Sequence, residues 1–167
     1  MAEEAVREST MEYVVLRPSW VYGPEDRRLN TFLALTRYLP FVPVIGDGHV
    51  RVRPVSVDDV ARAAALSISK PEAANRIFDL AGPQELTVDE VLRTVQAMIG
   101  KSRPLIHLPV GMMKLVAGCL SMLPSPPLSP LAINFLLTAE QVDPRPAEEF
   151  FGIRFEPLET ALRRYLS

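Results

Sequence analysis

The stretch that decides the fold is Leu16-Arg17-Pro18-Ser19-Trp20-Val21-Tyr22-Gly23-Pro24. It continues a run from residue 13 whose valines and tyrosine favour a β-strand. Pro18 ends that strand, because proline fixes φ and restricts the residue before it. The stretch therefore predicts a strand over residues 13–17, followed by a tight loop that leads into a helix.

Two helices further along the chain carry sequence signals at their first residues. Ser56 precedes Asp59 by three residues and Thr87 precedes Glu90 by three, which is the pattern of a capped helix start. Gly100 follows the second periodic apolar stripe and is placed to end that helix. We predict helices that begin at residues 57 and 88, with Asp59 and its neighbour Asp58 acting as structural carboxylates in the first turn.

The remaining elements alternate between strand and helix. Residues 50–55 follow a turn at 46–48 and predict a hairpin or strand pair with residues 42–45. We also predict helices over 3–10, 29–38, 110–123, 130–137 and 158–166, and strands over 76–81 and 104–108. This interleaving is typical of an α/β or α+β lobe.

The composition excludes several classes of partner and site. Lysine and arginine total 18 and aspartate and glutamate total 20, so no basic field exists to bind a nucleic acid. A single cysteine, Cys119, allows no internal disulfide, and with only His49 and His107 the common zinc spacings are absent. We therefore expect no nucleic acid partner, no metal and a cytoplasmic location.

The usual catalytic constellations are also missing from the sequence. The eight glycines form no Gly-rich turn of the dinucleotide or P-loop kind. No tyrosine is followed four residues later by a lysine, and neither histidine lies near a nucleophile elbow. We predict that this chain contains no catalytic residue.

Several strings carry a resemblance to a known family. They are Leu16–Pro24, Gly46–Gly48 followed by Arg53–Ala61, Leu80–Pro83 and Leu86–Val91. In order and spacing they resemble the C-terminal half of an extended or atypical short-chain dehydrogenase/reductase, of the NAD-dependent epimerase/dehydratase superfamily. The form of residues 54–60, the apolar helices and residues 152–166 look closest to the branch of the NAD(P)H-binding accessory subunit of complex I and its bacterial relatives.

The resemblance implies an α/β fold that is the C-terminal part of an NAD(P)-binding Rossmann-like fold: its last parallel strands plus a small, mainly helical substrate lobe. Residues 1–167 would form a single C-terminal substrate-side portion. Residues 1–28 and 56–81 would join the sheet layer, and residues 29–55 and 82–167 the smaller lobe. The Gly-rich turn and the Tyr/Lys pair would lie in the missing half. We therefore expect NAD or NADP in the full-length parent, none bound by this fragment, and no activity of this chain alone.

The resemblance also assigns candidate site residues. The loop against the nicotinamide end of the cofactor would be Pro18, Ser19, Trp20 and Val21, and the residues beside the substrate Tyr22, His49 and Arg53. Arg53 lies near the position where epimerases hold a substrate phosphate, a task that suits a bidentate guanidinium. Pro54 stands where an aromatic residue is usual, which argues against a sugar-nucleotide substrate. The alternatives are that the prolines only shape a loop, and that Arg53 and His49 are solvated surface residues.

The apolar segment 110–137 requires a cover, either the core of the small lobe or a partner. We expect a membrane surface or a protein partner there, which would make the protein peripheral to a membrane. Prolines between residues 124 and 130 interrupt the uncharged run over 115–139, so no transmembrane helix is expected. Half of a doubly wound sheet exposes an edge, so we also expect an oligomer or a swapped assembly.

Two functions follow from these expectations. The first is the substrate-binding portion of an NAD(P)-dependent epimerase/dehydratase or reductase that acts on a small-molecule substrate. The alternative is a non-catalytic NAD(P)H-binding accessory or assembly protein related to the complex I subunit.

Overall fold

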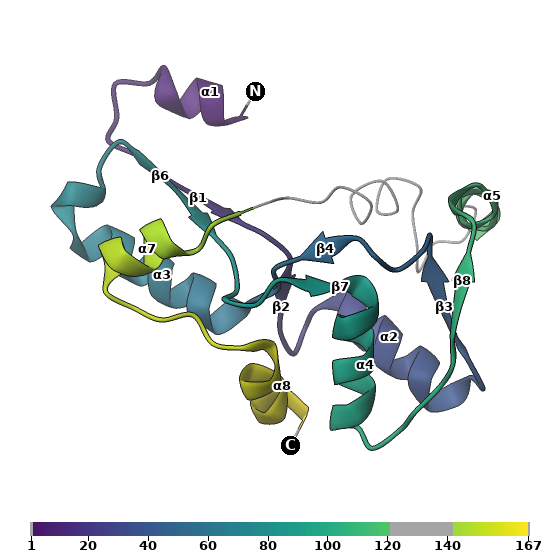
Figure 1. Ribbon diagram of the computed structural model, residues 1–167. Helices are drawn as coiled ribbons and strands as arrows, with labels where there is room; N and C mark the ends of the chain where they lie inside the picture. The colour runs from purple at the N-terminus through teal and green to yellow at the C-terminus, as the bar shows by residue number, and fades with distance from the viewer. Residues whose placement is uncertain (1, 121–141, 167) are drawn as a thin grey trace.

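A computed structural model of the chain describes residues 2–120 and 142–166, and the chain runs through short strands and helices of moderate length (Figure 1). The helices are α1 (Ala2–Arg7), α2 (Arg27–Tyr38), α3 (Val57–Ser69), the 3-10 turn η1 (Pro71–Ala73), α4 (Val88–Met98), α5 (Val110–Leu120), α7 (Arg145–Phe151) and α8 (Leu158–Leu166). The strands are β1 (Val14–Pro18), β2 (Val21–Tyr22), β3 (Val42–Ile45), β4 (Arg51–Val52), β5 (Val55–Ser56), β6 (Arg76–Leu80), β7 (Leu86–Thr87) and β8 (Leu105–Leu108). The helix predicted over residues 130–137 lies outside the described residues.

The longest strand pair is β1 with β6, which run parallel from Val14 opposite Arg76 to Pro18 opposite Leu80. Helix α3 lies between them in sequence and contacts β1, so these elements form a strand, helix, parallel strand unit. Figure 1 shows this pair at one end of the molecule with α3 and α7, and the β3–β8 pair at the other end with α2 and α4. The arrangement is α/β and Rossmann-like, and the predicted strands over 13–17 and 76–81 are confirmed.

The predicted hairpin between residues 42–45 and 50–55 is wrong. β3 pairs in parallel with β8, β4 pairs antiparallel with β7, and β5 pairs in parallel with β2. Gly46 and Gly48 both have positive φ, at 75° and 72°, and the turn redirects the chain without closing a two-stranded ribbon. The partners of these strands come mainly from residues beyond 80, which local alternation cannot indicate.

Both predicted helix starts are confirmed by their capping bonds. The Ser56 hydroxyl accepts from the Asp59 amide at 3.1 Å, and Thr87 with Glu90 forms a complete capping box at the start of α4. Gly100 has φ 66° directly after α4, as expected of a glycine at a helix end.

Two hydrophobic clusters hold the elements together. One joins α2, β3, α4 and α8 through buried residues that include Phe32, Val44, Val95 and Leu162. The other joins α3, β6 and α7, where the Phe78 ring lies 4.7 Å from the ring centroids of both Phe150 and Phe151. The division into a sheet layer and a smaller lobe remains a prediction.

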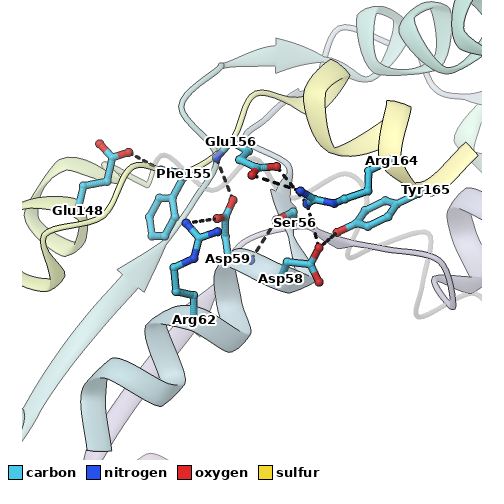
Figure 2. A network of polar contacts seen from close by, with 9 residues as sticks. All are labelled: Ser56, Asp58, Asp59, Arg62, Glu148, Phe155, Glu156, Arg164 and Tyr165. Atoms are coloured by element: carbon cyan, nitrogen blue, oxygen red, sulfur yellow. Dashed lines mark hydrogen bonds and ion pairs between the residues drawn. The ribbon is translucent and has the colours of Figure 1, made fainter. Parts of the chain in front are cut away.

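A polar network ties the C-terminal residues to the start of α3 (Figure 2). The Asp59 carboxylate is almost fully buried, accepts from the Glu156 amide at 2.9 Å and lies 3.6 Å from the Arg62 guanidinium. Arg164 bridges Asp58 at 2.9 Å and Glu156 at 3.1 Å. The two first-turn carboxylates therefore position α3 and also anchor the chain that leads into α8.

We expect Asp59→Ala to lower the free energy of unfolding by about 2 kcal/mol, because it removes a buried carboxylate and leaves the part-buried Glu156 amide without its acceptor. The matched change Asp58→Ala removes a half-exposed partner of Arg164 and should cost no more than about 1 kcal/mol. Urea unfolding of both variants measures the difference. Equal losses would mean that burial of the Asp59 carboxylate is not what holds the C-terminal segment.

Candidate functional site

The loop after β1 is fixed where β1 and β6 end. The Ser19 amide donates to the Leu80 carbonyl at 2.8 Å, and the Ser19 hydroxyl donates to the Arg53 carbonyl at 2.5 Å. The Val55 amide donates to the Trp20 carbonyl at 2.9 Å. Residues 18–21 thus lie at the carboxyl ends of parallel strands, which is where open α/β sheets bind ligands.

Arg53 is held from two directions. The Gly82 amide donates to the Arg53 carbonyl at 3.3 Å, and the Arg53 guanidinium donates to the Pro83 carbonyl at 3.3 Å. A Cβ at position 82 would lie 1.9 Å from the Pro54 carbonyl oxygen, so only glycine allows this close approach. The backbone therefore presents the Arg53 side chain in a defined place.

That side chain lines an open cleft of about 590 Å³, which we call the Arg53 cleft. Its described lining consists of Arg53, Pro83, Glu85, Val142, Asp143, Pro144, Arg145 and Glu148. The mixture of guanidiniums and carboxylates makes it a polar site, suited to a charged ligand.

Each carboxylate of the cleft already has a partner. Asp143 accepts three bonds from the Arg145 side chain, at 2.8, 3.0 and 3.1 Å, and these bonds, with the Arg145 amide, lower the pKa of Asp143 to about 2. Glu148 accepts from the Phe155 amide at 2.8 Å, as the dashed line in Figure 2 shows. Glu85 lies 3.5 Å from the Arg51 guanidinium.

The other residues expected at the site lie outside the Arg53 cleft. Tyr22 is buried, with its ring edge-on to Tyr165 at 6.2 Å, and this burial raises the pKa of its hydroxyl. His49 is exposed at the turn before β4, 3.7 Å from the Asp47 carboxylate. The structure thus brings Ser19 and Arg53 together, while Tyr22 and His49 stand apart from them.

Sequence reasoning missed Asp143, Arg145 and Glu148, along with the helix α7 that carries the last two. A signal was present, because a carboxylate and an arginine two residues apart, each followed by proline, form a rigid local ion pair. The local sequence does not indicate where the Asp143–Arg145 pair lies in the fold. Its place in the same cleft as Arg53 therefore could not be predicted.

The described residues lack two further features, a metal-binding cluster and a membrane-spanning helix. Over 2–120 and 142–166 no cluster of three histidine, cysteine or acidic side chains is placed to hold a metal ion. None of the helices described is long and apolar enough to cross a membrane.

Comparison with known sequences finds one matching family and several relatives. Residues 1–81 match the model of the NAD dependent epimerase/dehydratase family. The chain is 31% identical over 118 residues to the mitochondrial NADH dehydrogenase (ubiquinone) 1 alpha subcomplex subunit 9 of Arabidopsis thaliana, covering 70% of this chain and 29% of that protein. It is 28% identical over 160 residues to the mitochondrial NADH-ubiquinone oxidoreductase 40 kDa subunit of Neurospora crassa, covering 95% of this chain and 41% of that one. The chain therefore spans well under half of each of these relatives.

Solved structures share the fold at low sequence identity. The human epimerase family protein SDR39U1 with NADPH superposes with a TM-score of 0.72 at 21% identity, over 94% of this chain and 49% of that one. A UDP-glucuronic acid 4-epimerase from Bacillus cereus, in complex with UDP-glucuronic acid and NAD, gives 0.65 at 16% identity, over 91% of this chain and 43% of that one. These structural relatives bind NAD or NADPH.

The family match corrects two expectations. It falls on residues 1–81 and includes the parallel β1–β6 pair, which indicates the N-terminal, nucleotide-binding Rossmann part of the family. The expectation that this chain is the C-terminal half was wrong, and so was the fold class of last strands plus a substrate lobe. Strand, loop and helix units recur in both halves of such folds, so strings like Leu16–Pro24 do not by themselves fix which half they belong to. Residues 1–81 are thus similar to the NAD dependent epimerase/dehydratase family, and the solved structures share the α/β fold of this chain.

Proposed function

We propose that this chain is part of a non-catalytic NAD(P)H-binding accessory protein related to the complex I subunits, and that the Arg53 cleft binds an anionic group without turnover. The names of the curated relatives support the accessory role, since they are subunits of NADH dehydrogenases. The observation that carries the proposal is the chemistry of the Arg53 cleft. Among the described residues that line it, Arg53 is a cation available for binding, and none is placed to move a proton.

General acid and base catalysis needs a group whose pKa lies near the working pH. The described lining of the cleft contains no tyrosine, histidine, cysteine or lysine. Asp143, with its pKa of about 2, stays charged at neutral pH, and Glu148 and Glu85 are engaged by the Phe155 amide and by Arg51. These contacts favour binding over turnover.

The residues present fit one part of a dinucleotide, its phosphates. Arg53 offers a guanidinium of the kind that binds phosphate in a fork, whereas the Arg145 guanidinium is paired with Asp143. The sequence has no Gly-rich turn, so we assign the phosphate contact made by this chain to the Arg53 side chain. In an enzyme, bound NAD(P)H would supply hydride chemistry. To this chain we assign only the binding of the phosphate groups.

We also propose that residues 18–21 lie beside the nicotinamide end of the cofactor. Tyr22 and His49 would contact the substrate outside the Arg53 cleft.

A partner surface over residues 110–137 also remains a proposal. Within it, Met112 and Leu115 of α5 are 47% and 71% exposed, while residues 121–137 lie outside the described part. We likewise propose an oligomeric assembly in a reducing, cytosol-like compartment; the names of the curated relatives say mitochondrial.

Direct titration of the purified full-length protein with NADH and with NADPH tests the function. We expect saturable binding by calorimetry and no loss of reduced-nicotinamide absorbance when nucleotide sugars or quinones are added. Arg53→Gln should weaken binding about ten-fold, because it removes a charge-assisted bond worth ~1.5 kcal/mol. Epimerisation of a nucleotide sugar, oxidation of the cofactor, or failure to bind either nucleotide would each overturn the proposal.

The matched control for that titration is Arg93→Gln. Arg93 is an exposed arginine of α4 that does not line the cleft, so its removal changes the net charge equally without touching the site. An equal weakening by both variants would show a general charge effect and would remove Arg53 from the site.

The claim that Asp143 stays charged has its own test. A carbon NMR titration should give a midpoint at about pH 2 for the Asp143 carboxyl, and Arg145→Ala should move it up toward the ordinary value of about 3.9. Because the pKa is lowered in the folded protein, the Asp143–Arg145 pair is complete above about pH 4 and is lost as the pH falls through about 2. Arg154→Ala is the control and should leave the midpoint in place. An unshifted wild-type midpoint would contradict the pairing.

A further inference from the structure

The chain segments that follow α2 and α4 lie side by side at one end of the molecule. Figure 1 shows both helices ending on the same side, where the chain turns into β3 and β8. The Lys101 ammonium donates to the Arg37 carbonyl at 3.2 Å and joins the two segments. Residues 37–41 and 101–104 therefore form one surface, which we call the α2–α4 end.

Three cations belong to the α2–α4 end, and their charges are not neutralised by carboxylates. Arg37 is exposed, while Lys101 and Arg103 are half-buried. Lys101 and Arg103 donate to main-chain carbonyls in the last turn of α2, at 3.2 and 3.5 Å, and a carbonyl does not cancel a positive charge. In the part of the chain that the structure describes, none of the ion pairs involves any of the three.

The sequence explains this local excess of positive charge. Residues 27–46 and 91–120 contain no aspartate or glutamate, although the whole chain has 20 acidic and 18 basic residues. The acidic residues that flank these segments, Asp26, Asp47 and Glu90, lie at the far ends of α2, β3 and α4 from this surface. The nearly balanced total charge thus conceals one face that attracts anions.

Exposed apolar side chains stand among these cations. Tyr38 is 78% exposed, Phe41 38% and Leu39 36%. A tyrosine has an apolar ring and a polar tip, which suits the boundary between a membrane and water. Cations beside exposed aromatic and aliphatic groups match an anionic lipid surface, where the charges meet the headgroups and the apolar groups enter the acyl boundary.

We propose that the α2–α4 end docks on the surface of an anionic lipid bilayer. The three cations contact the lipid headgroups, and Tyr38, Leu39 and Phe41 enter the interface between headgroups and acyl chains. None of these residues lines the Arg53 cleft or belongs to the segment 110–137. The docking is therefore independent of the proposed cofactor function, and its failure leaves that function untouched.

Co-sedimentation of the full-length protein with lipid vesicles tests the docking. We expect binding to phosphatidylcholine vesicles that contain phosphatidylserine to be at least about 25-fold tighter than to phosphatidylcholine alone, because each cation contributes about five-fold. This advantage should fall as the salt concentration rises. The double change Arg37→Gln with Lys101→Gln should remove most of it.

The matched control for that double change is Arg7→Gln with Arg154→Gln. It removes two exposed cations from α1 and from the chain after α7, at the other end of the molecule, and should leave vesicle binding unchanged. Equal binding to both kinds of vesicle, no binding to either, or equal weakening by the two double variants would overturn the proposal.

A tryptophan placed in the patch reports insertion directly. Tyr38→Trp should be quenched by brominated phosphatidylcholine in vesicles that contain phosphatidylserine, whereas Ile68→Trp, at an 88% exposed position of α3, should not. The wild-type protein gives the background from Trp20, its single native tryptophan. Both replaced side chains are exposed, so folding is not expected to change. Quenching of Ile68→Trp alone, or binding to an RNA homopolymer without binding to vesicles, would refute the lipid assignment.

Discussion

The Arg53 carbonyl oxygen is the acceptor on which the candidate site depends. It receives the Ser19 hydroxyl from the loop after β1 and the Gly82 amide from the loop after β6. One backbone oxygen therefore joins the ends of two parallel strands to the segment that carries Arg53. Because a main-chain atom makes this junction, the position of the Arg53 side chain follows from the strand pairing and from the absence of a side chain at Gly82.

The C-terminal residues complete the site through the buried Asp59 carboxylate. Asp59 fixes the Glu156 amide, and Glu148, one turn into α7, fixes the Phe155 amide just before it. These two bonds hold α7 against α3 and β6, and α7 begins with the Arg145 that pairs with Asp143. A charge buried for structural reasons thus determines where the charges of the Arg53 cleft lie.

The parts of the fold that sequence could predict are those whose signals are local. The caps at Ser56 and Thr87 were predictable, because donor and acceptor lie three residues apart. The pairing partners of β3 and β4 could not be predicted, because β8 and β7 lie dozens of residues away in the sequence. Alternation of apolar and polar residues predicts a strand but not the strand it pairs with. At the candidate site, Ser19 and Arg53 could be singled out from their motif, whereas Asp143 and Arg145 owe their place to tertiary packing. The prediction that the chain is the C-terminal half of the fold was wrong for a related reason. Strand, loop and helix units recur in both halves, so the sequence of one loop does not identify the half it belongs to.

A single short segment runs between the Arg53 cleft and an apolar cavity. Val50 lines an apolar cavity of about 350 Å³ between α2, β3 and α4, and Arg53 lines the polar Arg53 cleft, with β4 and its antiparallel partner β7 between them. The Val88 amide donates to the Val50 carbonyl at 3.0 Å, and Arg53 is fixed by Gly82 and Pro83, so both ends of the segment are bound to the backbone of residues 82–88. The sites share a scaffold but no lining side chain, so the effect of a side-chain change at one can be separated from its effect at the other.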